Sequence, residues 1–519
     1  MFAAGQREMQ QIDQYTIETI GLPGVVLMEN AGAKVVEEIL ESMPCPNPKI
    51  VILAGGGDNG GDGFVIARRL VDLGMAPFLC VMADRTRIKG DAKVHFDAYV
   101  KRGLPVSYFN ERDLQALERR LGEADIIVDA MLGTGVKGVL REPFHTVIPL
   151  VNKYADKSCI ISVDIPSGVN SDTGKAEGGA IKAAKTVTFV FPKKGFFLQD
   201  GPKYVGEWKA VDISVPSSVA EDLNLKMATV ITPDLAAQAL PKRTPYGHKG
   251  TFGHALVIGG SRQYAGAPVF SAQAALNSGA GLTTLAIPEN LYPILAAQHP
   301  EILFAPLQEK EGHFAQEAIE ELSSRLKAFN SIVVGPGMSR FRRGEEWMKW
   351  LLSALHAQPI VLDADALYLM RDHLGEAQAY PGEVIMTPHP GEMAVLLQTS
   401  VQEVEKHRLE IAEAFAKEHG VYLLLKGHRS LIASPDGEVY INPYGHDALG
   451  KGGSGDVLTG LIASFLAQGA APLESVIAAS YLHAKAGEEQ AKRLSRYGVL
   501  PQDIIHGVRE ELRKMEKQL

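Results

Sequence analysis

Short runs of apolar, mostly β-branched residues alternate with stretches of helical spacing along the first part of the chain. Four such runs lie at 50–54, 78–82, 126–129 and 160–164. Apolar positions at helical spacing fill 64–73, and a similar pattern at 9–20 predicts an opening helix that ends at a Gly-Leu-Pro-Gly break. Fully apolar strands separated by helices indicate a parallel, doubly wound α/β sheet.

A second series of the same kind begins after a polar, proline-punctuated stretch. Its apolar runs lie at 255–258, 283–287, 331–334, 359–362, 384–386 and 421–425. Two extended runs around Asp436-Gly437 predict a hairpin, which would add antiparallel strands to one side of a second α/β sheet. The pattern therefore predicts two domains, 1–222 and 223–519.

Composition narrows the class of protein. The chain has 519 residues, 46% of them hydrophobic, and a net charge of −9, so no overall positive field favours nucleic acid or an acidic membrane surface. The three cysteines, Cys45, Cys80 and Cys159, lack metal-ligand spacing and indicate a reducing compartment. Without an apolar N-terminal segment or a stretch of membrane-spanning length, we expect a cytoplasmic protein acting on small molecules.

A glycine-rich run, 55–63, follows the first strand and precedes a helix. Glycines there let backbone N–H groups and a helix N-terminus approach a phosphate. Gly55, Gly57 and Gly60 also satisfy the GxGxxG pattern, and Asp84 follows the next strand as a ribose-binding acid would. Taken alone, the run is compatible with a redox site for NAD or with a purely structural turn.

Two further strand ends carry an acid beside glycines. Asp129 precedes a second glycine-rich loop, and Asp164 precedes Pro166-Ser167-Gly168. Each acid by itself would serve as a helix cap. Because strand ends of an open α/β sheet meet at one crevice, the three motifs together predict a ligand site.

These three motifs and the segment Leu-Met-Glu-Asn-Ala-Gly at 27–32 resemble the NAD(P)H-hydrate epimerase family, which has a Rossmann-like fold. The resemblance covers residues 1 to about 220. The resemblance implies that the hydrated dinucleotide is bound by Asp58, Asn59, Gly60, Gly61, Asp62, Gly133, Thr134, Gly135, Val136, Lys137, Gly138, Val139 and Asp164. It implies that K⁺ is bound by Asn59, Asp129 and Ser167, whose oxygen atoms suit a hard cation.

The implied reaction exchanges the R and S forms at the hydroxyl-bearing C6 of the hydrated nicotinamide ring. The hydroxyl leaves and returns if a side chain handles the proton. We expect Asp164 to be that acid/base, with Lys137 as the second choice. Asp58 stands where the family usually has asparagine, and its added charge would weaken phosphate binding unless it points elsewhere.

The second series carries its own glycine-rich run, 450–460, before an apolar helix. Backbone N–H groups at such a helix start form an anion hole, and Asp456 would meet a substrate hydroxyl there. With 335–337, 362–367, Thr387-Pro388-His389 and 425–430, the run resembles ribokinase-like proteins and, in detail, ADP-dependent NAD(P)H-hydrate dehydratases.

This second resemblance spans about 230–515 and implies a division of roles. The hydrated dinucleotide would be bound by Ala267, Gly337, His389 and Asp456. The adenine nucleotide would be bound by Lys426, Gly427, His428, Arg429, Ser430 and Gly455. Asp456 would be the base on the C6 hydroxyl, which takes a phosphoryl group from ADP before phosphate leaves, and Mg²⁺ is expected. Lys451 and Ser454 depart from the family's usual residues, which bears on nucleotide preference.

Together the halves resemble the family of bifunctional NAD(P)H-hydrate repair enzymes. We therefore expect NADHX and NADPHX as substrates, ADP as co-substrate, and a homo-oligomer, with a tetramer suggested by resemblance. The alternative is a ribokinase-like small-molecule kinase whose N-terminal half is a non-catalytic binding module. A redox enzyme using the first glycine-rich run for NAD is a third possibility.

Overall fold

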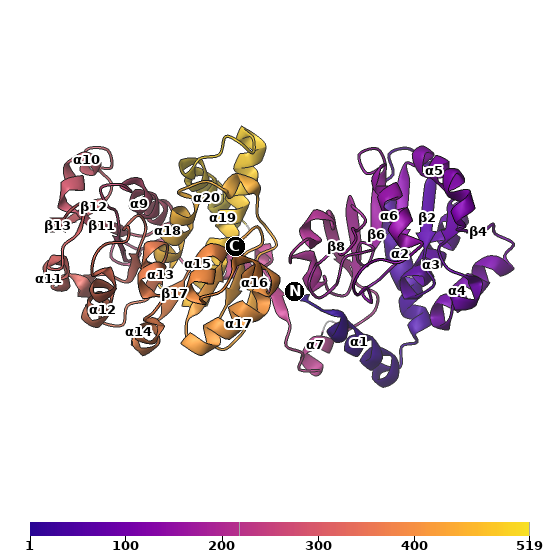
Figure 1. Ribbon diagram of the computed structural model, residues 1–519, viewed down its shortest axis with the longest axis horizontal. Coiled ribbons are helices and arrows are strands. Elements are labelled where there is room, and N and C mark those ends of the chain that lie inside the picture. The colour runs from indigo at the N-terminus through magenta and orange to yellow at the C-terminus, as the bar shows by residue number, and fades with distance from the viewer. Residues whose placement is uncertain (217, 518–519) are drawn as a thin grey trace. The chain divides into compact units, whose positions relative to one another are not determined.

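The computed structural model describes residues 1–216 and 218–517, which form two compact units, Met1–Ala228 and Thr229–Leu519 (Figure 1). Each unit is an α/β fold built around its own sheet. The two sheets carry separate hydrophobic cores. The predicted α/β class is confirmed for both parts of the chain.

The first unit is a parallel sheet in the order β4-β3-β2-β5-β6-β7-β8. The strands of this sheet are β2 (Ile50–Ala54), β3 (Phe78–Val81), β4 (Ser107–Tyr108), β5 (Ile126–Ala130), β6 (Cys159–Val163), β7 (Lys185–Phe189) and β8 (Glu207–Val211). The short strand β1 (Phe2–Ala3) precedes them in the chain and is not part of this sheet. Its helices are α1 (Gln6–Gln14), α2 (Gly24–Glu41), α3 (Asp58–Asp72), α4 (Gly90–Lys101), α5 (Leu114–Glu123), α6 (Phe144–Asn152) and α7 (Val219–Asp222).

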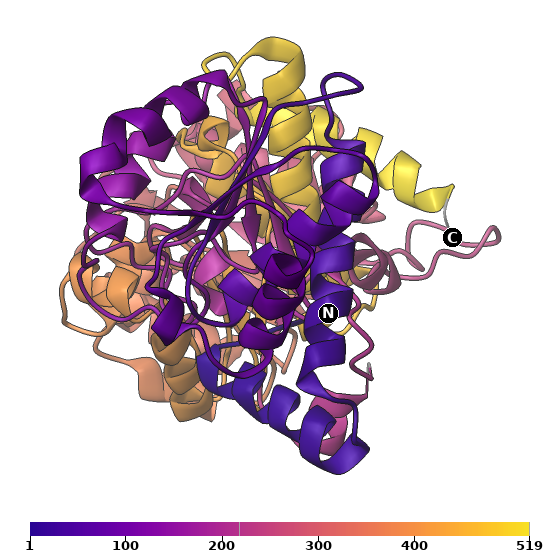
Figure 2. The ribbon, with the colours of Figure 1, turned by 90° about the vertical axis from the view of Figure 1, so that its right-hand side faces the viewer.

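Helices cover both faces of this sheet, as the fully apolar strands require. One core joins α1 to α4 to the sheet, and a second core joins α5 and α6 to its other face. Figure 2 turns this unit toward the viewer, with the strands between the indigo N-terminal helices and the violet ones. The predicted opening helix is present as α1, which continues as a π-helical turn over Tyr15–Ile20 and ends at Gly21 with a φ of +85°.

The second unit has a mixed sheet in the order β9-β20-β19-β18-β17-β16-β15-β10-β11-β12. Its strands are β9 (Ala228–Val230), β10 (His254–Ile258), β11 (Leu282–Pro288), β12 (Leu303–Leu307), β13 (Glu309–Lys310), β14 (His313–Phe314), β15 (Ser331–Val334), β16 (Ile360–Leu362), β17 (Val384–Met386), β18 (Tyr422–Leu425), β19 (Leu431–Ala433) and β20 (Val439–Ile441). The strands β18, β19 and β20 pair antiparallel, which confirms the predicted hairpin.

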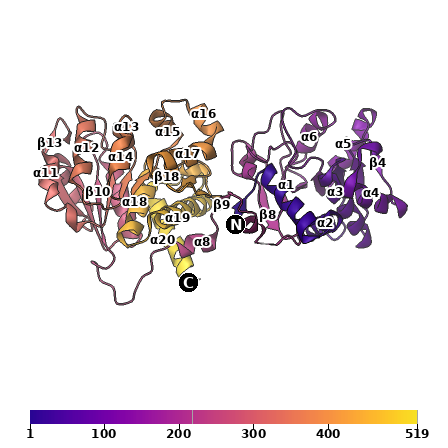
Figure 3. The ribbon, with the colours of Figure 1, turned by 90° about the horizontal axis from the view of Figure 1, so that it is seen from below.

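The helices of this unit divide between the two faces of its sheet. They are α8 (Pro233–Gln238), α9 (Gly266–Asn277), α10 (Tyr292–Ala296), α11 (Ala318–Ser323), α12 (Gly344–Ala354), α13 (Asp365–Met370), α14 (Leu374–Ala379), α15 (Pro390–Leu396), α16 (Val401–Lys406), α17 (Arg408–His419), α18 (Ser454–Ala467), α19 (Pro472–Leu494) and α20 (Pro501–Glu516). Figure 3 shows α18, α19 and α20 on one side of the strands and α12 to α17 on the other. The helix α18 is almost wholly buried, so its N-terminus is held rigidly at the carboxyl ends of the strands.

Candidate active sites of the two units

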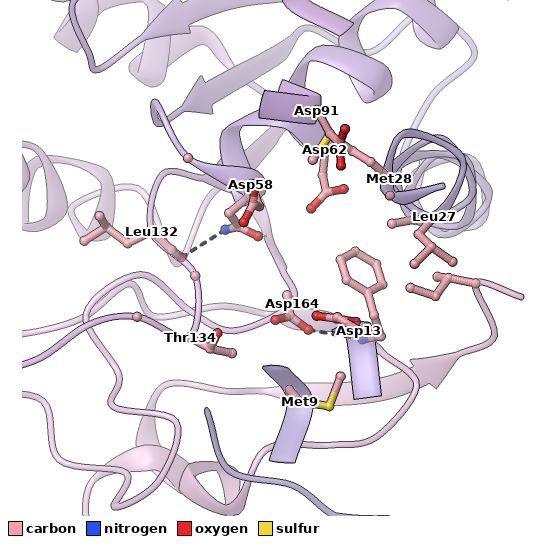
Figure 4. Close-up of a pocket in the computed structure, with 18 of the residues that line it drawn as sticks. Met9, Asp13, Leu27, Met28, Asp58, Asp62, Asp91, Leu132, Thr134 and Asp164 are labelled. Carbon is pink, nitrogen blue, oxygen red and sulfur yellow. Dashed lines mark hydrogen bonds between the residues drawn. The ribbon is translucent and has the colours of Figure 1, made fainter. Parts of the chain in front are cut away.

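A cavity of about 580 Å³ opens at the carboxyl ends of the strands of the first unit (Figure 4). The start of α3, the loop after β5 and the end of β6 form its walls, and α1 and α2 contribute apolar side chains such as Met9, Leu27 and Met28. Ligands of open α/β sheets bind at this edge. The three motifs that the sequence singled out are therefore brought to one crevice.

The charged residues that line this cavity are aspartates, namely Asp13, Asp58, Asp62, Asp91 and Asp164. Asp58 and Asp62 lie on one wall, and Asp164 and Asp13 lie on the opposite one (Figure 4). Burial, followed by repulsion from Asp164, raises the pKa of Asp62 well above its ordinary value. Burial also raises the pKa of Asp13 to about 6. The wall formed by α3 therefore offers a carboxyl group that keeps its proton to higher pH than an ordinary aspartate.

Asp164 has a cationic partner behind the cavity wall. The Lys193 ammonium lies 2.6 Å from its Oδ1, and the lysine side chain is only 1% exposed. Asp164 itself has a φ of +62°, and its N–H donates to the Val187 carbonyl at 2.7 Å. A non-glycine residue held in this sparsely populated region is typical of functional sites.

The three residues predicted to bind K⁺ meet around Leu132. Asn59 donates through Nδ2 to the Leu132 carbonyl at 2.9 Å, and the Leu132 N–H donates to Ser167 Oγ at 2.9 Å. Ser167 Oγ in turn donates to Asp129 Oδ1 at 2.5 Å. Asp129 is fully buried, and burial raises its pKa despite the hydrogen bonds from Ser162, Ser167 and Met131. This set of carboxylate, hydroxyl and amide oxygens fits a hard monovalent cation, which would offset the buried charge.

The predicted boundary between the glycine-rich run, 55–63, and the helix at 64–73 is wrong. Helix α3 already begins at Asp58, with Gly57 as its N-cap, so residues 58–62 form the first turns of the helix. The glycines serve close packing: a Cβ on Gly60 would meet the Gly55 carbonyl, and one on Gly63 would lie 3.0 Å from the Ala130 Cβ. Asp58, Asn59 and Asp62 line the cavity, whereas Gly60 and Gly61 are buried behind it.

The second predicted loop divides in the same way. Gly133, Thr134, Gly135 and Val136 line the cavity. Residues 137–139, among them Lys137, are exposed on the surface. Binding by these loop residues stays a prediction.

The second unit has a cavity of about 480 Å³ that joins three of its predicted site residues, Ala267, Gly337 and Asp456. Gly337 has a φ of +64°, and a Cβ there would lie 3.1 Å from the Ala267 Cβ. Tyr264, which is 55% exposed, and Arg340 also line this cavity. The glycine thus keeps the cavity open beside the acid.

Asp456 stands in the first turn of α18, directly after the glycine-rich run. Burial raises the pKa of Asp456 to about 7, and repulsion from Asp363 adds to this, although the Lys426 ammonium opposes it. A carboxyl group with this pKa exchanges its proton near neutral pH, which is the property that general base catalysis requires.

Lys426 links the elements around Asp456. Its Nζ lies 2.8 Å from Asp363 Oδ1 and 3.7 Å from Glu392 Oε2, and 3.5 Å from the position a Cβ on Gly455 would take. Burial opposes the charge of Lys426, but Asp363 and Glu392 outweigh it and raise the pKa of the lysine. Asp363 also accepts hydrogen bonds from the Thr387 and Thr459 hydroxyls, at 2.8 Å and 2.7 Å. Asp363 and Glu392 therefore hold Lys426 close to Gly455 at the start of α18.

The predicted nucleotide-binding segment follows Lys426 as an open turn. Gly427 and His428 are exposed, and Arg429 and Ser430 are half-buried. Arg408, only 8% exposed, donates through Nη2 to the carbonyls of Leu425, Lys426 and Arg429. The shape of the turn is thus set by a buried arginine on α17.

His389 forms the N-cap of α15. Its Nδ1 accepts from the backbone N–H of Gly391 at 2.9 Å and of Glu392 at 3.3 Å, and its side chain is 57% exposed. The histidine therefore presents its Nε2 edge toward solvent and Glu392. Its contact with the dinucleotide stays a prediction.

The two departures from the usual family pattern have local partners. Lys451 donates to the Tyr497 carbonyl at 2.6 Å, and Ser454 Oγ lies 3.1 Å from Nε2 of the buried His483. Burial lowers the pKa of His483 to about 4, so this imidazole is neutral beneath the helix start.

Sequence reasoning missed Lys193 and Asp363 as site residues. Lys193 follows the end of a strand in Phe191-Pro192-Lys193, and Asp363 follows the apolar run at 359–362, so position after a strand end was the available signal. Among residues 1–216 and 218–517, no group of three or more His, Cys, Asp or Glu side chains could hold a metal ion. In the same residues, no helix is both long and apolar enough to span a bilayer.

Two different protein-family models match two separate segments of the chain. The model of the YjeF-related protein N-terminus matches residues 24–195, and the NAD(P)H-hydrate dehydratase model matches 255–509. The ADP/ATP-dependent NAD(P)H-hydrate dehydratase of Bacillus subtilis, co-crystallised with ATP and Mg²⁺, is 29% identical over 56% of this chain and 99% of its own, with a TM-score of 0.49.

Full-length relatives cover both units at once. The bifunctional NAD(P)H-hydrate repair enzyme Nnr of Moorella thermoacetica is 37% identical over 100% of this chain and 98% of its own length. The enzyme of the same name from Thermofilum pendens is 33% identical over 100% of this chain and 97% of its own. Since both relatives are more than 30% identical to this chain over nearly the whole length of each protein, the chain belongs to the family of bifunctional NAD(P)H-hydrate repair enzymes.

Proposed function

We propose that the chain restores hydrated NADH and NADPH through one activity in each unit. The first unit interconverts the R and S epimers of the hydrates. The second unit dehydrates the S epimer at the expense of ADP, giving NAD(P)H, AMP and phosphate. Membership of the family supports this assignment, and the observation that carries it is Asp456 in a cavity at the start of a buried helix.

Asp456 is proposed as the base of the dehydratase. Its carboxylate takes the proton of the C6 hydroxyl, and the hydroxyl oxygen attacks the β-phosphorus of ADP while the bond from that phosphorus to the bridging oxygen breaks and AMP leaves. The original C6–O bond then breaks with phosphate as the leaving group while the lone pair of the ring nitrogen forms a C=N bond, and loss of a proton from C5 restores the ring double bond. Phosphorylation is needed because hydroxide is a poor leaving group.

Cationic side chains and backbone N–H donors of the second unit are both proposed to bind the nucleotide. We assign the phosphates of ADP to the N-terminus of α18 at Gly455, to Lys426 and to the turn through Arg429 and Ser430. The helix start supplies N–H donors and the favourable end of the helix dipole. A bound Mg²⁺ would neutralise phosphate charge and would be held mainly by the phosphates.

In the first unit, Asp62 is proposed as the proton donor and Asp164, on the opposite wall (Figure 4), as the proton acceptor. Asp62, whose pKa burial raises, gives a proton to the C6 hydroxyl, which leaves as water while the lone pair of the ring nitrogen forms a C=N bond. Water then adds to the opposite face of C6 and loses a proton to Asp164. The reverse reaction starts from the resulting state, so no net proton is consumed.

K⁺ is proposed at Asn59, Asp129 and Ser167, where it would supply positive charge against the aspartates and the phosphates of the substrate. Exposed Lys137 is placed less well for proton transfer than Asp164. The use of both NADHX and NADPHX and assembly into a homo-oligomer also belong to this proposal.

The test uses the full chain and an equal mixture of R and S hydrates. With ADP, wild type is expected to convert the whole mixture to NAD(P)H with matching AMP and phosphate. Asp456→Asn should abolish recovery, whereas Asp164→Asn should stop after the S form is consumed, apart from slow spontaneous exchange. Residual R hydrate with wild type would refute the epimerase assignment.

The kinase alternative gives a different result in the same experiment. A kinase with a non-catalytic N-terminal module would leave both hydrates unchanged and would release a stable phosphate ester from another acceptor. An NAD-dependent redox enzyme would instead consume no ADP. Recovery of NAD(P)H with stoichiometric AMP excludes both.

A further inference from the structure

Lys193 is a fully buried charged group beside the first cavity. It lies between β7 and the 3₁₀ turn Lys194–Phe196, with 0% of its surface exposed. Its Nζ donates to Asp164 Oδ1 at 2.6 Å and to Thr188 Oγ1 at 2.9 Å, and it also contacts the Phe189 and Phe191 carbonyls at 3.2 Å and 3.1 Å. A buried ammonium is tolerated only when it is paired and fully hydrogen-bonded.

The contacts of Asp164 are one-sided. Lys193 Nζ, Thr188 Oγ1 and the Phe189 N–H donate to its Oδ1, at 2.6, 3.1 and 3.2 Å. Within the described part of the chain, every hydrogen bond of this carboxylate ends on that one oxygen. Its side chain is 16% exposed and lines the cavity. Oδ2 is therefore the oxygen left to meet a ligand.

Two other lysines near the cavity, Lys194 and Lys137, lie in different surroundings from Lys193. Lys194 Nζ lies 2.7 Å from Glu8 Oε1, and Lys137 is exposed on the loop after β5. Lys193 is thus the lysine that the fold places on Asp164, and Lys194 provides a matched control one residue away.

We propose that Lys193 is a positioning residue of the epimerase. It fixes Oδ1 of Asp164 and offsets the charge of the carboxylate, so that Oδ2 is presented to C6 to take the proton of the incoming water. This inference rests on the proposed epimerase function. Lys193 does not touch the substrate, because its ammonium lies behind the carboxylate.

The experiment follows exchange of purified R hydrate of NADH to the S form in the full chain without ADP, so that the dehydratase is idle. Lys193→Met is expected to lower kcat about 100-fold, the size of a lost acid/base function, with KM within about threefold because binding is retained. Lys193→Arg, which keeps a cation, should recover part of this loss. Lys194→Met should stay within about twofold of wild type, since its partner Glu8 lies outside the proton path.

A double-mutant cycle separates positioning from general support of the fold. If Lys193 acts through Asp164, Lys193→Met adds no further loss of exchange rate in an Asp164→Asn background. The double variant should also resist urea better than Lys193→Met alone, because neither buried charge is left without a partner. Additive losses of rate would show that Lys193 acts by another route and would overturn the inference.

The remaining outcomes are also decisive. Full exchange activity in Lys193→Met, with none in Asp164→Asn, refutes the role of Lys193 and leaves the proposed function intact. A wild type that exchanges no epimer refutes both. If Lys193→Met does not fold but the double variant does, the pairing is supported; if neither folds, Lys193 is a structural residue only.

Discussion

Both units pair a lysine with an aspartate that follows a strand end, but the buried partner differs. In the first unit the lysine is the buried partner: Lys193 is 1% exposed and Asp164 is 16% exposed. In the second unit the acid is buried: Asp363 is 2% exposed and Lys426 is 18% exposed. The carboxylate is the more exposed partner in the first pair, and the ammonium is the more exposed partner in the second.

The two sites also differ in where a carboxyl group with a raised pKa lies relative to the lysine–aspartate pair. The second cavity keeps a separate acid, Asp456, whose pKa burial and Asp363 raise to about 7. In the first cavity Asp164 is paired with Lys193, and Asp62, one of the carboxyl groups whose pKa burial raises, lies on the opposite wall (Figure 4). An exposed ammonium suits the binding of anionic phosphates, whereas loss and return of a hydroxyl at C6 needs one group that gives a proton and one that accepts it.

The largest expected effect separates the two activities. Asp456→Asn should lower the dehydration kcat by about 1,000-fold, within the range for loss of a general base, and leave epimer exchange unchanged. Chromatography of the R and S hydrates with and without ADP measures both rates in one preparation. Asp436→Asn, on the exposed hairpin turn, is the matched control. Loss of epimer exchange in Asp456→Asn would contradict the independence of the two sites.

The second prediction concerns stability. Lys426→Met leaves Asp363 buried without its cation, so we expect a loss of about 3–5 kcal/mol in the free energy of unfolding of the second unit. Urea denaturation measures it. Lys417→Met breaks only the surface pair with Glu413 and should cost no more than about 0.5 kcal/mol. Equal effects of the two variants would show that the buried pair is not specially coupled.

The third prediction concerns pH. Dehydration should fall about tenfold for each pH unit below the pKa of about 7 given by Asp456, because the base must be ionised. The same raised pKa means that the folded chain binds more protons than the unfolded chain between pH 4 and 7, using the ordinary value of 3.8 and the raised value of about 7. Stability of the second unit should therefore fall as pH rises through this window.

Urea titrations at pH 5 and 8 test the stability arm of that prediction. Asp456→Asn removes the titrating group, so the variant should lose less stability than wild type between these two pH values. A pH–rate profile for kcat that stays flat from pH 5 to 8 would argue against Asp456 as the base.

The smallest expected effect tests the departure at Asp58. This residue lines the first cavity, and burial and Asp91 raise its pKa. Asp58→Asn removes negative charge that would face the phosphates, so KM for epimer exchange should fall by about threefold, or roughly 0.7 kcal/mol, with kcat unchanged. Exchange kinetics at several hydrate concentrations give both constants. An increased KM would mean that Asp58 accepts a hydrogen bond from the substrate instead.

Much of the fold followed from the apolar runs. The strands β2, β5 and β6 and the hairpin of β19 and β20 were predictable because their apolar or turn-forming residues leave few alternatives. The short strand β4 and the partly exposed β8 lack such a signal, since their burial depends on neighbours distant in sequence. The start of α3 was misplaced because glycines that favour loops were selected there for contact with Gly55 and Ala130.

Sequence alone determined the two α/β units, the acids at the strand ends and the glycine-rich run before α18, because each is a local pattern that β-strand burial or phosphate contact requires. Only the tertiary structure decided which charges pair. Lys193 reaches Asp164 across 29 positions and Lys426 reaches Asp363 across 63, and both contacts depend on the register of neighbouring parallel strands. Burial and the charges of residues distant in sequence raise the pKa of Asp62 and of Asp456, and a linear pattern does not contain those distances.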